Sequence, residues 1–351
     1  MKQITDNDIA NHFGAEVEEV INKSSIQNKT NIFNTIKEAF NTKKNIQEKI
    51  KSLFSDLVNL SKKDVHILIV GASGSGKSET INALLKDANI HDQKAISRKG
   101  SDSVTMNIET FKIGNCSIYD SPGLGDNLKL ENQHIFKIKE KLKEVTDNGQ
   151  QLIDLVVVIL NASNLRNLKS EYEIINEILL PNLENHQKLI IALNKTDLFD
   201  DGDNWDKKRN KPTQLLRQDI EIEINKLKNK IKDSTGIDVN PIYYSAGRKD
   251  RNKKPWNLIR LYEEMNKNIA VEKKISLGIQ INTKDNFENS ENFEEVKKNI
   301  EIDVQTSLEK SIREKMRQKN KDKEEESDKE SEGWLSKIIA AFTGVVSLFS
   351  W

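Results

Sequence analysis

A glycine-rich segment at residues 71–78, with the sequence GASGSGKS, constrains the fold of this chain more than any other feature. It follows the apolar run 65–70 and precedes a run with helical spacing at residues 80–85. In a strand, glycine loop and helix of this kind, successive backbone amides point at an anion, and the helix N-terminus adds partial positive charge. The segment therefore predicts a phosphate-binding loop in an α/β fold.

The side chains of this loop predict how a nucleotide is held. Lys77 is expected to bridge the β- and γ-phosphates, and the Ser78 hydroxyl to take one Mg²⁺ position. A simple glycine- and serine-rich turn after a strand is the alternative, but strand, full motif and helix stand in register. The predicted phosphate-side contacts are Ser73, Gly74, Ser75, Gly76, Lys77, Ser78 and Glu79.

A second motif, Asn-Lys-Thr-Asp at residues 194–197, follows the apolar run 189–193. The carboxylate of Asp197 can accept two parallel hydrogen bonds from N1 and N2 of guanine, whereas adenine offers no such pair of donors. Open α/β sheets bind ligands at the carboxyl ends of their strands, where this motif lies. We therefore expect Asn194, Lys195 and Asp197 to select GTP over ATP.

Two shorter motifs complete the series. Asp120 opens an Asp-Ser-Pro-Gly sequence in which its carboxylate can hold Mg²⁺ through water, and the Gly123 amide can approach the γ-phosphate. Ser245 and Ala246 follow the apolar run 242–244, so the Ala246 amide can meet the O6 acceptor of guanine. Each motif is weak alone, and their order along the chain makes them specific.

The second switch contact is predicted from a strand-like alternation at residues 104–111. Thr105 is our choice for the switch threonine, facing Mg²⁺ and the attacking water, with Ser101 and Ser103 as rivals. A β-branched residue that simply favours a strand is the other reading. The predicted catalytic residues are thus Lys77, Thr105 and Gly123, and the predicted metal ligands are Ser78, Thr105 and Asp120.

These motifs together resemble the Ras-related P-loop GTPases of the translation-factor class. The amino-acid sequence of residues 78–84 and 120–126 is most similar to the bacterial Era-like branch, the predicted ribosome-binding-type GTPases. The resemblance covers residues 63–270. It implies a three-layer α/β/α G domain with a six-stranded, mostly parallel sheet, which binds GTP or GDP with Mg²⁺ and hydrolyses GTP.

Two departures from the family pattern bear on mechanism. Leu124 stands where many Ras-type enzymes have a water-positioning glutamine, and leucine cannot polarise water. Gly74 replaces the asparagine of cation-assisted relatives, and the loop instead resembles that of septin, immunity-related and chloroplast-import GTPases, whose G domains meet across the nucleotide. Turnover is therefore expected to be slow without a dimer mate or activator.

The flanks predict a four-part organisation. A helical segment at 1–62 precedes the G domain at 63–270, a charged helical segment follows at 271–332, and an apolar tail ends the sequence at 333–351. Apolar residues recur with helical spacing over 291–318, and such a stripe needs a partner helix to cover it. The N-terminal helical segment is the expected partner.

The tail at 333–351 has one apolar helical face and a tryptophan at each end. A bilayer span needs about 20 apolar residues, so a helix lying in the membrane interface is one interpretation. Docking into a groove of the same chain or of a second copy is the other. We leave both open here.

Composition narrows the location and the partners. Lys+Arg and Asp+Glu are both 55, so no overall charge draws the chain to nucleic acid or membrane. Cys116 is the only cysteine, which suits a reducing compartment, and the N-terminus lacks the apolar segment of a secretory signal. We expect a cytoplasmic GTP-hydrolysing switch or, alternatively, a self-assembling, membrane-associated GTPase of dynamin or septin character.

Overall fold

The computed structural model forms two compact units. It describes residues 52, 55–57, 59–85, 108–124, 128–165, 168–247, 253–281, 284–321 and 339. The first unit comprises Val65–Ile269 and Thr283–Val296, and the second unit takes the described residues of Met1–Asp64, Ala270–Asn282 and Lys297–Trp351. The predictions for Thr105 and its rivals, and for the tail apart from Ile339, lie outside the described residues.

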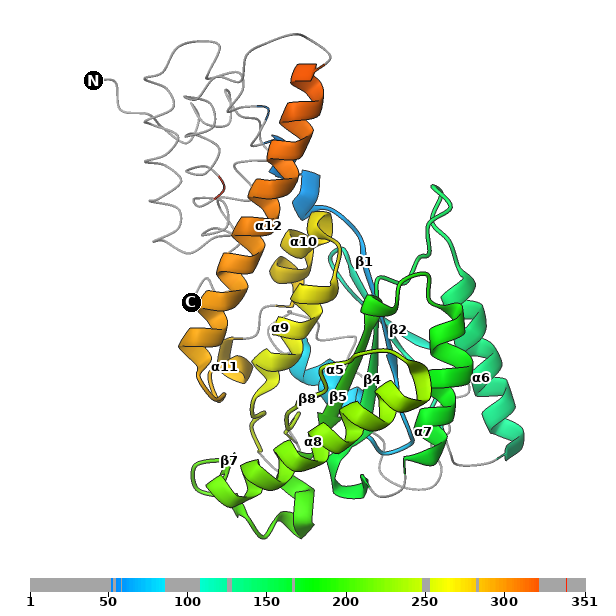
Figure 1. Cartoon of the computed structure of the whole chain (residues 1–351), viewed down its shortest axis with the longest axis vertical. Coiled ribbons are helices and arrows are strands. Elements are labelled where there is room, and N and C mark those ends of the chain that lie inside the picture. The colour runs from blue at the N-terminus through cyan, green and yellow to red at the C-terminus, as the bar shows by residue number, and fades with distance from the viewer. Residues whose placement is uncertain are drawn as a thin grey trace. The chain divides into compact units, whose positions relative to one another are not determined.

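A six-stranded sheet forms the centre of the first unit (Figure 1). Its order is β2-β3-β1-β4-β5-β8; β2 runs antiparallel to β3, and every other pair is parallel. The strands are β1 (Val65–Val70), β2 (Glu109–Ile113), β3 (Cys116–Asp120), β4 (Leu155–Asn161), β5 (Leu189–Asn194) and β8 (Ile242–Tyr243). The predicted α/β fold with a mostly parallel sheet is confirmed.

The strand sequences explain both the parallel arrangement and the position of the site. β4 reads LVVVILN and is buried at its first six positions, as expected for a strand covered by helices on both faces. In the parallel register Ile69 pairs with Asp120, and Asn161 pairs with Asn194. The polar residues that end β3 and β5 are thereby brought to the same edge of the sheet as the loop after β1.

Helices cover the two faces of the sheet. Figure 1 shows α6 and α7 on one side and α9 on the other. The bounds are α5 (Lys77–Leu84), α6 (Leu128–Lys143), α7 (Lys169–Ile174), α8 (Gln214–Thr235) and α9 (Leu258–Asn268). The helix α8 begins where the Thr213 hydroxyl accepts a hydrogen bond from Leu216 N at 3.3 Å, and ends at Gly236 with φ of 73°.

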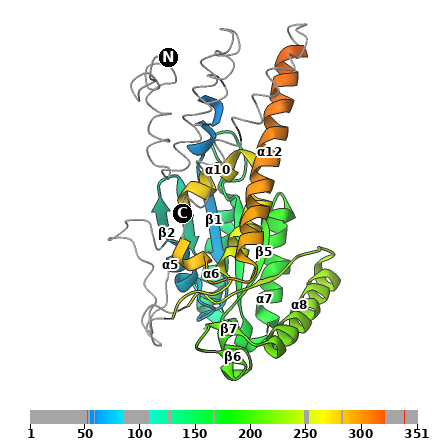
Figure 2. The same cartoon turned by 90° about the vertical axis from the view of Figure 1, so that its left-hand side faces the viewer.

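The sequence predicted a solvated loop after the second motif, over residues 199–211, and most of the charged residues there are exposed. The stretch also has regular structure: 3-10 turns over Thr196–Gly202 and a hairpin of β6 (Trp205–Asp206) and β7 (Lys211–Pro212), the two strands labelled in Figure 2. Trp205 is buried edge-on against Trp256, with ring centroids 5.3 Å apart. Trp205 is thus a buried apolar residue within a largely polar and exposed stretch.

Residues 283–296 return to the first unit after the chain has left it. The helix α11 (Lys284–Phe287) places Phe287 against Tyr262, with ring centroids 5.6 Å apart. The side chain of Asn286 is buried, and its Nδ2 donates to the carbonyl of Ala83 at 2.7 Å. This contact joins the segment to the last turn of α5.

The second unit contains α10 (Val271–Gln280) and most of α12 (Phe293–Lys321). The helical spacing predicted over 291–318 is seen in α12, whose buried residues recur every fourth position at Val296, Ile300, Val304, Leu308 and Ile312. Lys274 of α10 is buried, and its Nζ contacts Asp303 Oδ2 at 2.5 Å and Ser307 Oγ at 3.2 Å, one turn apart on α12. None of the helices that the structure describes is long and apolar enough to cross a membrane.

Candidate nucleotide-binding site

The glycine-rich loop joins β1 to α5 and encloses the head of Lys77. The Lys77 Nζ donates to the carbonyls of Gly71 at 3.1 Å and Ala72 at 3.2 Å, and the side chain is 8% exposed. Gly76 precedes the helix with φ of 93°, in the left-handed region. The helix N-terminus and a buried cation therefore converge on one loop, as anion binding requires.

The side chain of Asn194 connects three loops of the site. Its Nδ2 donates to the carbonyls of Ser75 at 3.0 Å and Gly76 at 3.4 Å, and its Oδ1 accepts from Lys195 N at 2.8 Å and Ala246 N at 2.9 Å. Asn194 is 1% exposed, so these bonds are shielded from water. The predicted phosphate loop and both predicted base-binding loops are thus held by one amide.

The two described residues predicted to hold the metal lie next to each other. Ser78 Oγ donates to Asp120 Oδ2 at 3.0 Å, and the other carboxylate oxygen, Oδ1, is buried with no hydrogen-bond partner among the described residues. Burial raises the pKa of Asp120 to about 6, although the charge of Lys77 and the hydrogen bond from Ser78 lower it. A buried, incompletely satisfied carboxylate beside a hydroxyl fits Mg²⁺, a cation that prefers oxygen ligands.

The segment after Asp120 lies directly against the phosphate loop. A Cβ on Gly123 would be 2.8 Å from Ser73 Cα, so only glycine fits there. Leu124 N donates to the carbonyl of Gly71 at 3.3 Å, and Ser73 N donates to the carbonyl of Leu124 at 3.1 Å. The side chain of Leu124 is 2% exposed and packs in the core, and a buried aliphatic group offers nothing to orient a water molecule.

The carboxylate predicted to read the base, that of Asp197, has partners on both oxygens. Ser245 Oγ donates to Asp197 Oδ1 at 2.6 Å, and Lys253 Nζ forms an ion pair with Asp197 Oδ2. The Ala246 amide, predicted to meet guanine O6, donates to Asn194 Oδ1 in this structure. A guanine base bound at Asp197, as the sequence predicts, would compete with Lys253 for this carboxylate.

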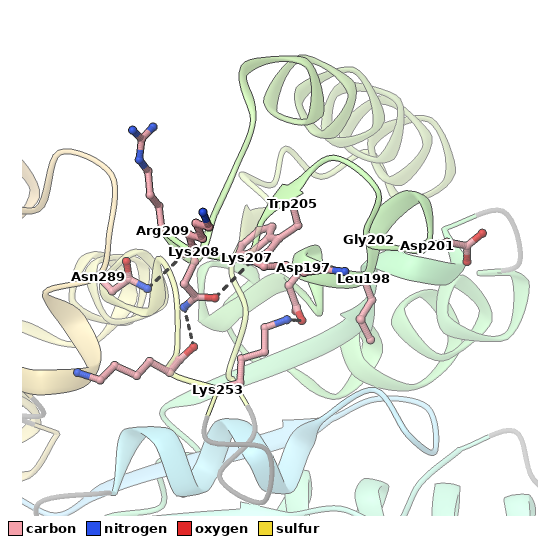
Figure 3. Close-up of a pocket in the computed structure, with 12 residues that line it drawn as sticks. Asp197, Leu198, Asp201, Gly202, Trp205, Lys207, Lys208, Arg209, Lys253 and Asn289 are labelled. Carbon is pink, nitrogen blue, oxygen red and sulfur yellow. Dashed lines mark hydrogen bonds and ion pairs between the residues drawn. The ribbon is translucent and has the colours of Figure 1, made fainter.

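Lys253 is a site residue that the sequence analysis missed. It follows the Ser245 motif in a basic, polar stretch, and nothing in that composition marks one lysine among its neighbours. Figure 3 shows Lys253 reaching Asp197 at the wall of a pocket of about 830 Å³. The pocket is lined by Asp197, Leu198, Asp201, Gly202, Trp205, Lys207, Lys208, Arg209, Asn210, Lys253, Lys254 and Asn289.

The four described motifs meet at one edge of the sheet, in the chain order typical of nucleotide-binding G domains. They lie at the carboxyl ends of four strands and are joined by the bonds described above. The phosphate loop follows β1, Asp120 and Gly123 lie at the end of β3, Asn194 and Asp197 at the end of β5, and Ser245 and Ala246 after β8. Glu79 lies in the first turn of α5. This arrangement is consistent with a P-loop GTPase G domain.

Comparison with known proteins agrees with this class. Residues 66–195 match the family model described as 50S ribosome-binding GTPase, which spans the phosphate loop and the beginning of the base-reading motif. No curated protein matches the chain. The family match supports binding of guanine nucleotide.

Several solved structures are similar in part. A probable GTP-binding protein engB is 20% identical over 58% of this chain and 98% of its own, with a TM-score of 0.36. Era in complex with MgGDPNP and a 16S ribosomal RNA fragment is 19% identical over 59% of this chain and 57% of its own, at 0.39. Toc33 from Arabidopsis thaliana in complex with GDP and Mg²⁺ is 16% identical over 61% of this chain and 82% of its own, at 0.40.

Replacing Gly76 by alanine should separate the phosphate loop from the base-binding loops. The added Cβ would lie 2.1 Å from Asn194 Nδ2, and the alanine would have to adopt the left-handed φ of Gly76. We expect GDP to bind at least about tenfold more weakly, since the buried amide loses hydrogen bonds. Fluorescent GDP titration measures this. The control is Gly149→Ala, because Gly149 also has a left-handed φ, of 75°, but a Cβ there would meet no atom of the described residues within 4 Å. Equal affinity of the two variants would contradict the role of Asn194.

Replacing Lys253 by methionine should strengthen guanine binding by about threefold to tenfold, because Asp197 no longer exchanges an ion pair for the base. Lys254→Met removes the same charge from the adjacent position and corrects for the general attraction of a lysine to phosphates. Titration of both variants with GDP measures the difference between their affinities. A Lys253→Met variant that binds GDP more weakly than Lys254→Met would show that Lys253 supports the bound base instead.

Proposed function

We propose that this chain binds GTP with Mg²⁺, hydrolyses it to GDP and phosphate, and acts as a molecular switch. The observation that carries the proposal is the Asn194 amide, which ties the phosphate loop to both base-binding loops. A site that holds phosphates and base through one buried side chain suits a nucleotide better than a free anion. The family match over residues 66–195 supports the same class.

The residues of the site would divide the chemistry as follows. Lys77 and the loop amides would stabilise negative charge on the phosphates, and Ser78 and Asp120 would hold Mg²⁺, which neutralises charge on the β- and γ-oxygens. The Gly123 amide would contact the γ-phosphate, and Thr105 remains our proposal for the switch threonine. Release of these two segments after hydrolysis would report the nucleotide state.

Two substitutions test phosphate binding and base choice separately. Lys77→Ala removes a charged donor, and we expect GTP and GDP to bind about 10-fold to 100-fold more weakly. Asp197→Asn presents an amide donor to the base, so guanine should lose its advantage over xanthine, whose C2 carbonyl accepts. Competition between GTP and XTP measures the second effect. Unchanged GTP binding in the first variant, or unchanged base choice in the second, would refute the assignment concerned.

A second candidate function follows from the burial of Leu124. Because this side chain cannot orient water, the group that does so would come from elsewhere, and a second copy of the chain meeting across the nucleotide is one source. We propose, as the alternative, a self-assembling GTPase in which hydrolysis accompanies oligomerisation. The tail at 333–351 would then serve either self-association or contact with a membrane surface.

Turnover as a function of protein concentration distinguishes the two candidates. For a self-assembling GTPase we expect the rate per molecule to rise with concentration until the dimer saturates, because the second copy completes the site. For a switch that awaits a separate activator, the rate should be slow and constant. Steady-state phosphate release, measured for the full chain and for a chain ending at residue 332, tests this. A rise that persists in the shorter chain would remove the tail from self-association.

Several finer assignments stay with this proposal. The Era-like wording of the motifs is our reason for proposing that branch, and the cytoplasm is the proposed location. A role in binding nucleic acid has no support in the sequence, which carries equal numbers of acidic and basic residues. Guanine nucleotide and Mg²⁺ are therefore the ligands we propose.

A further inference from the structure

A buried histidine contacts the segment predicted to sense the γ-phosphate. His134 lies in the second turn of α6 and is 4% exposed. Its Nδ1 is 2.9 Å from the carbonyl oxygen of Gly123. A carbonyl only accepts hydrogen bonds, so the proton must lie on Nδ1.

The peptide between Gly123 and Leu124 is therefore held from two directions. The Gly123 carbonyl accepts from His134, and the Leu124 amide of the same peptide donates to the carbonyl of Gly71 at 3.3 Å. The next carbonyl, that of Leu124, accepts from Ser73 N at 3.1 Å. Rotation of this peptide would break the bonds to α6 and to the phosphate loop together.

His134 is not explained by packing alone. Its Nε2 is buried and has no hydrogen-bond partner in the described part of the chain. An unsatisfied buried nitrogen costs free energy that an aliphatic side chain of similar size would avoid. The bond from Nδ1 to Gly123 is the observed interaction that a histidine supplies and a leucine cannot.

We infer that His134 is a positioning residue that holds the Gly123 backbone where its amide can recognise the γ-phosphate. The inference rests on the proposed function, since it concerns how the same site tells GTP from GDP. GDP has no γ-phosphate, so the contribution of His134 should be confined to the triphosphate. A histidine that only stabilised the fold would affect both nucleotides alike.

The test compares the affinities of GDP and GTPγS in matched variants of the full chain. His134→Leu removes the donor, and we expect about tenfold weaker binding of GTPγS with GDP affinity within about twofold of wild type. His134→Asn places an amide N–H near the position of Nδ1 and should restore both affinities. An equal loss for both nucleotides, no loss for either, or an Asn variant as impaired as the Leu variant would overturn the inference.

A second pair of variants guards against misfolding of the leucine variant. His134→Gln is polar like His134→Asn, but its longer side chain carries the amide beyond the position of Nδ1. The Gln variant should lose GTPγS affinity selectively while the Asn variant keeps it; equal behaviour of the two would overturn the inference. If the wild-type chain binds neither nucleotide, both the proposed function and the inference fail. If the wild type binds nucleotide but the variants change GDP and GTPγS affinity alike, only the inference is overturned.

Discussion

The buried amide of Asn194 is the interaction on which the geometry of the site depends. It donates hydrogen bonds to two carbonyls of the phosphate loop and accepts hydrogen bonds from the backbone amides of Lys195 and Ala246. Each such bond contributes about 0.5–1.5 kcal/mol, and an orphaned buried partner costs about 1–3 kcal/mol. The loops after β1, β5 and β8 are therefore coupled. A movement of the loops after β5 and β8 would break or strain hydrogen bonds to the phosphate loop.

The segment after Asp120, predicted to sense the γ-phosphate, is joined to the same arrangement. Gly123 lies against Ser73, and the backbone of Leu124 is hydrogen-bonded to the backbone of Gly71 and Ser73 in the phosphate loop. His134 of α6 donates to the carbonyl of the peptide between Gly123 and Leu124. Glycine is required at 123 because even a Cβ would clash with the neighbouring backbone. The site thus depends on close backbone contacts as much as on its charged groups.

The sheet and the phosphate-side motifs could be predicted from the sequence, because parallel strands read as continuous apolar runs and each motif follows one. Contacts between side chains distant in sequence could not. Trp205 of the polar stretch packs against Trp256, and Lys253, one of several neighbouring basic residues, pairs with Asp197. Neither has a periodicity or a spacing, so local pattern carries no signal for either. The assignment of Thr105 stays a prediction because it lies outside the described residues.

The return of residues 283–296 to the first unit has a consequence for dissecting the protein. The chain passes between the two units at 64/65, 269/270, 282/283 and 296/297, so neither unit is one continuous stretch. A chain cut after residue 269 would keep all the strands that the structure describes and the predicted nucleotide motifs. It would expose the face of Tyr262 that Phe287 covers and leave the Ala83 carbonyl without Asn286. A fusion protein that carries only residues 65–269 would therefore lack a part of the first unit, residues 283–296.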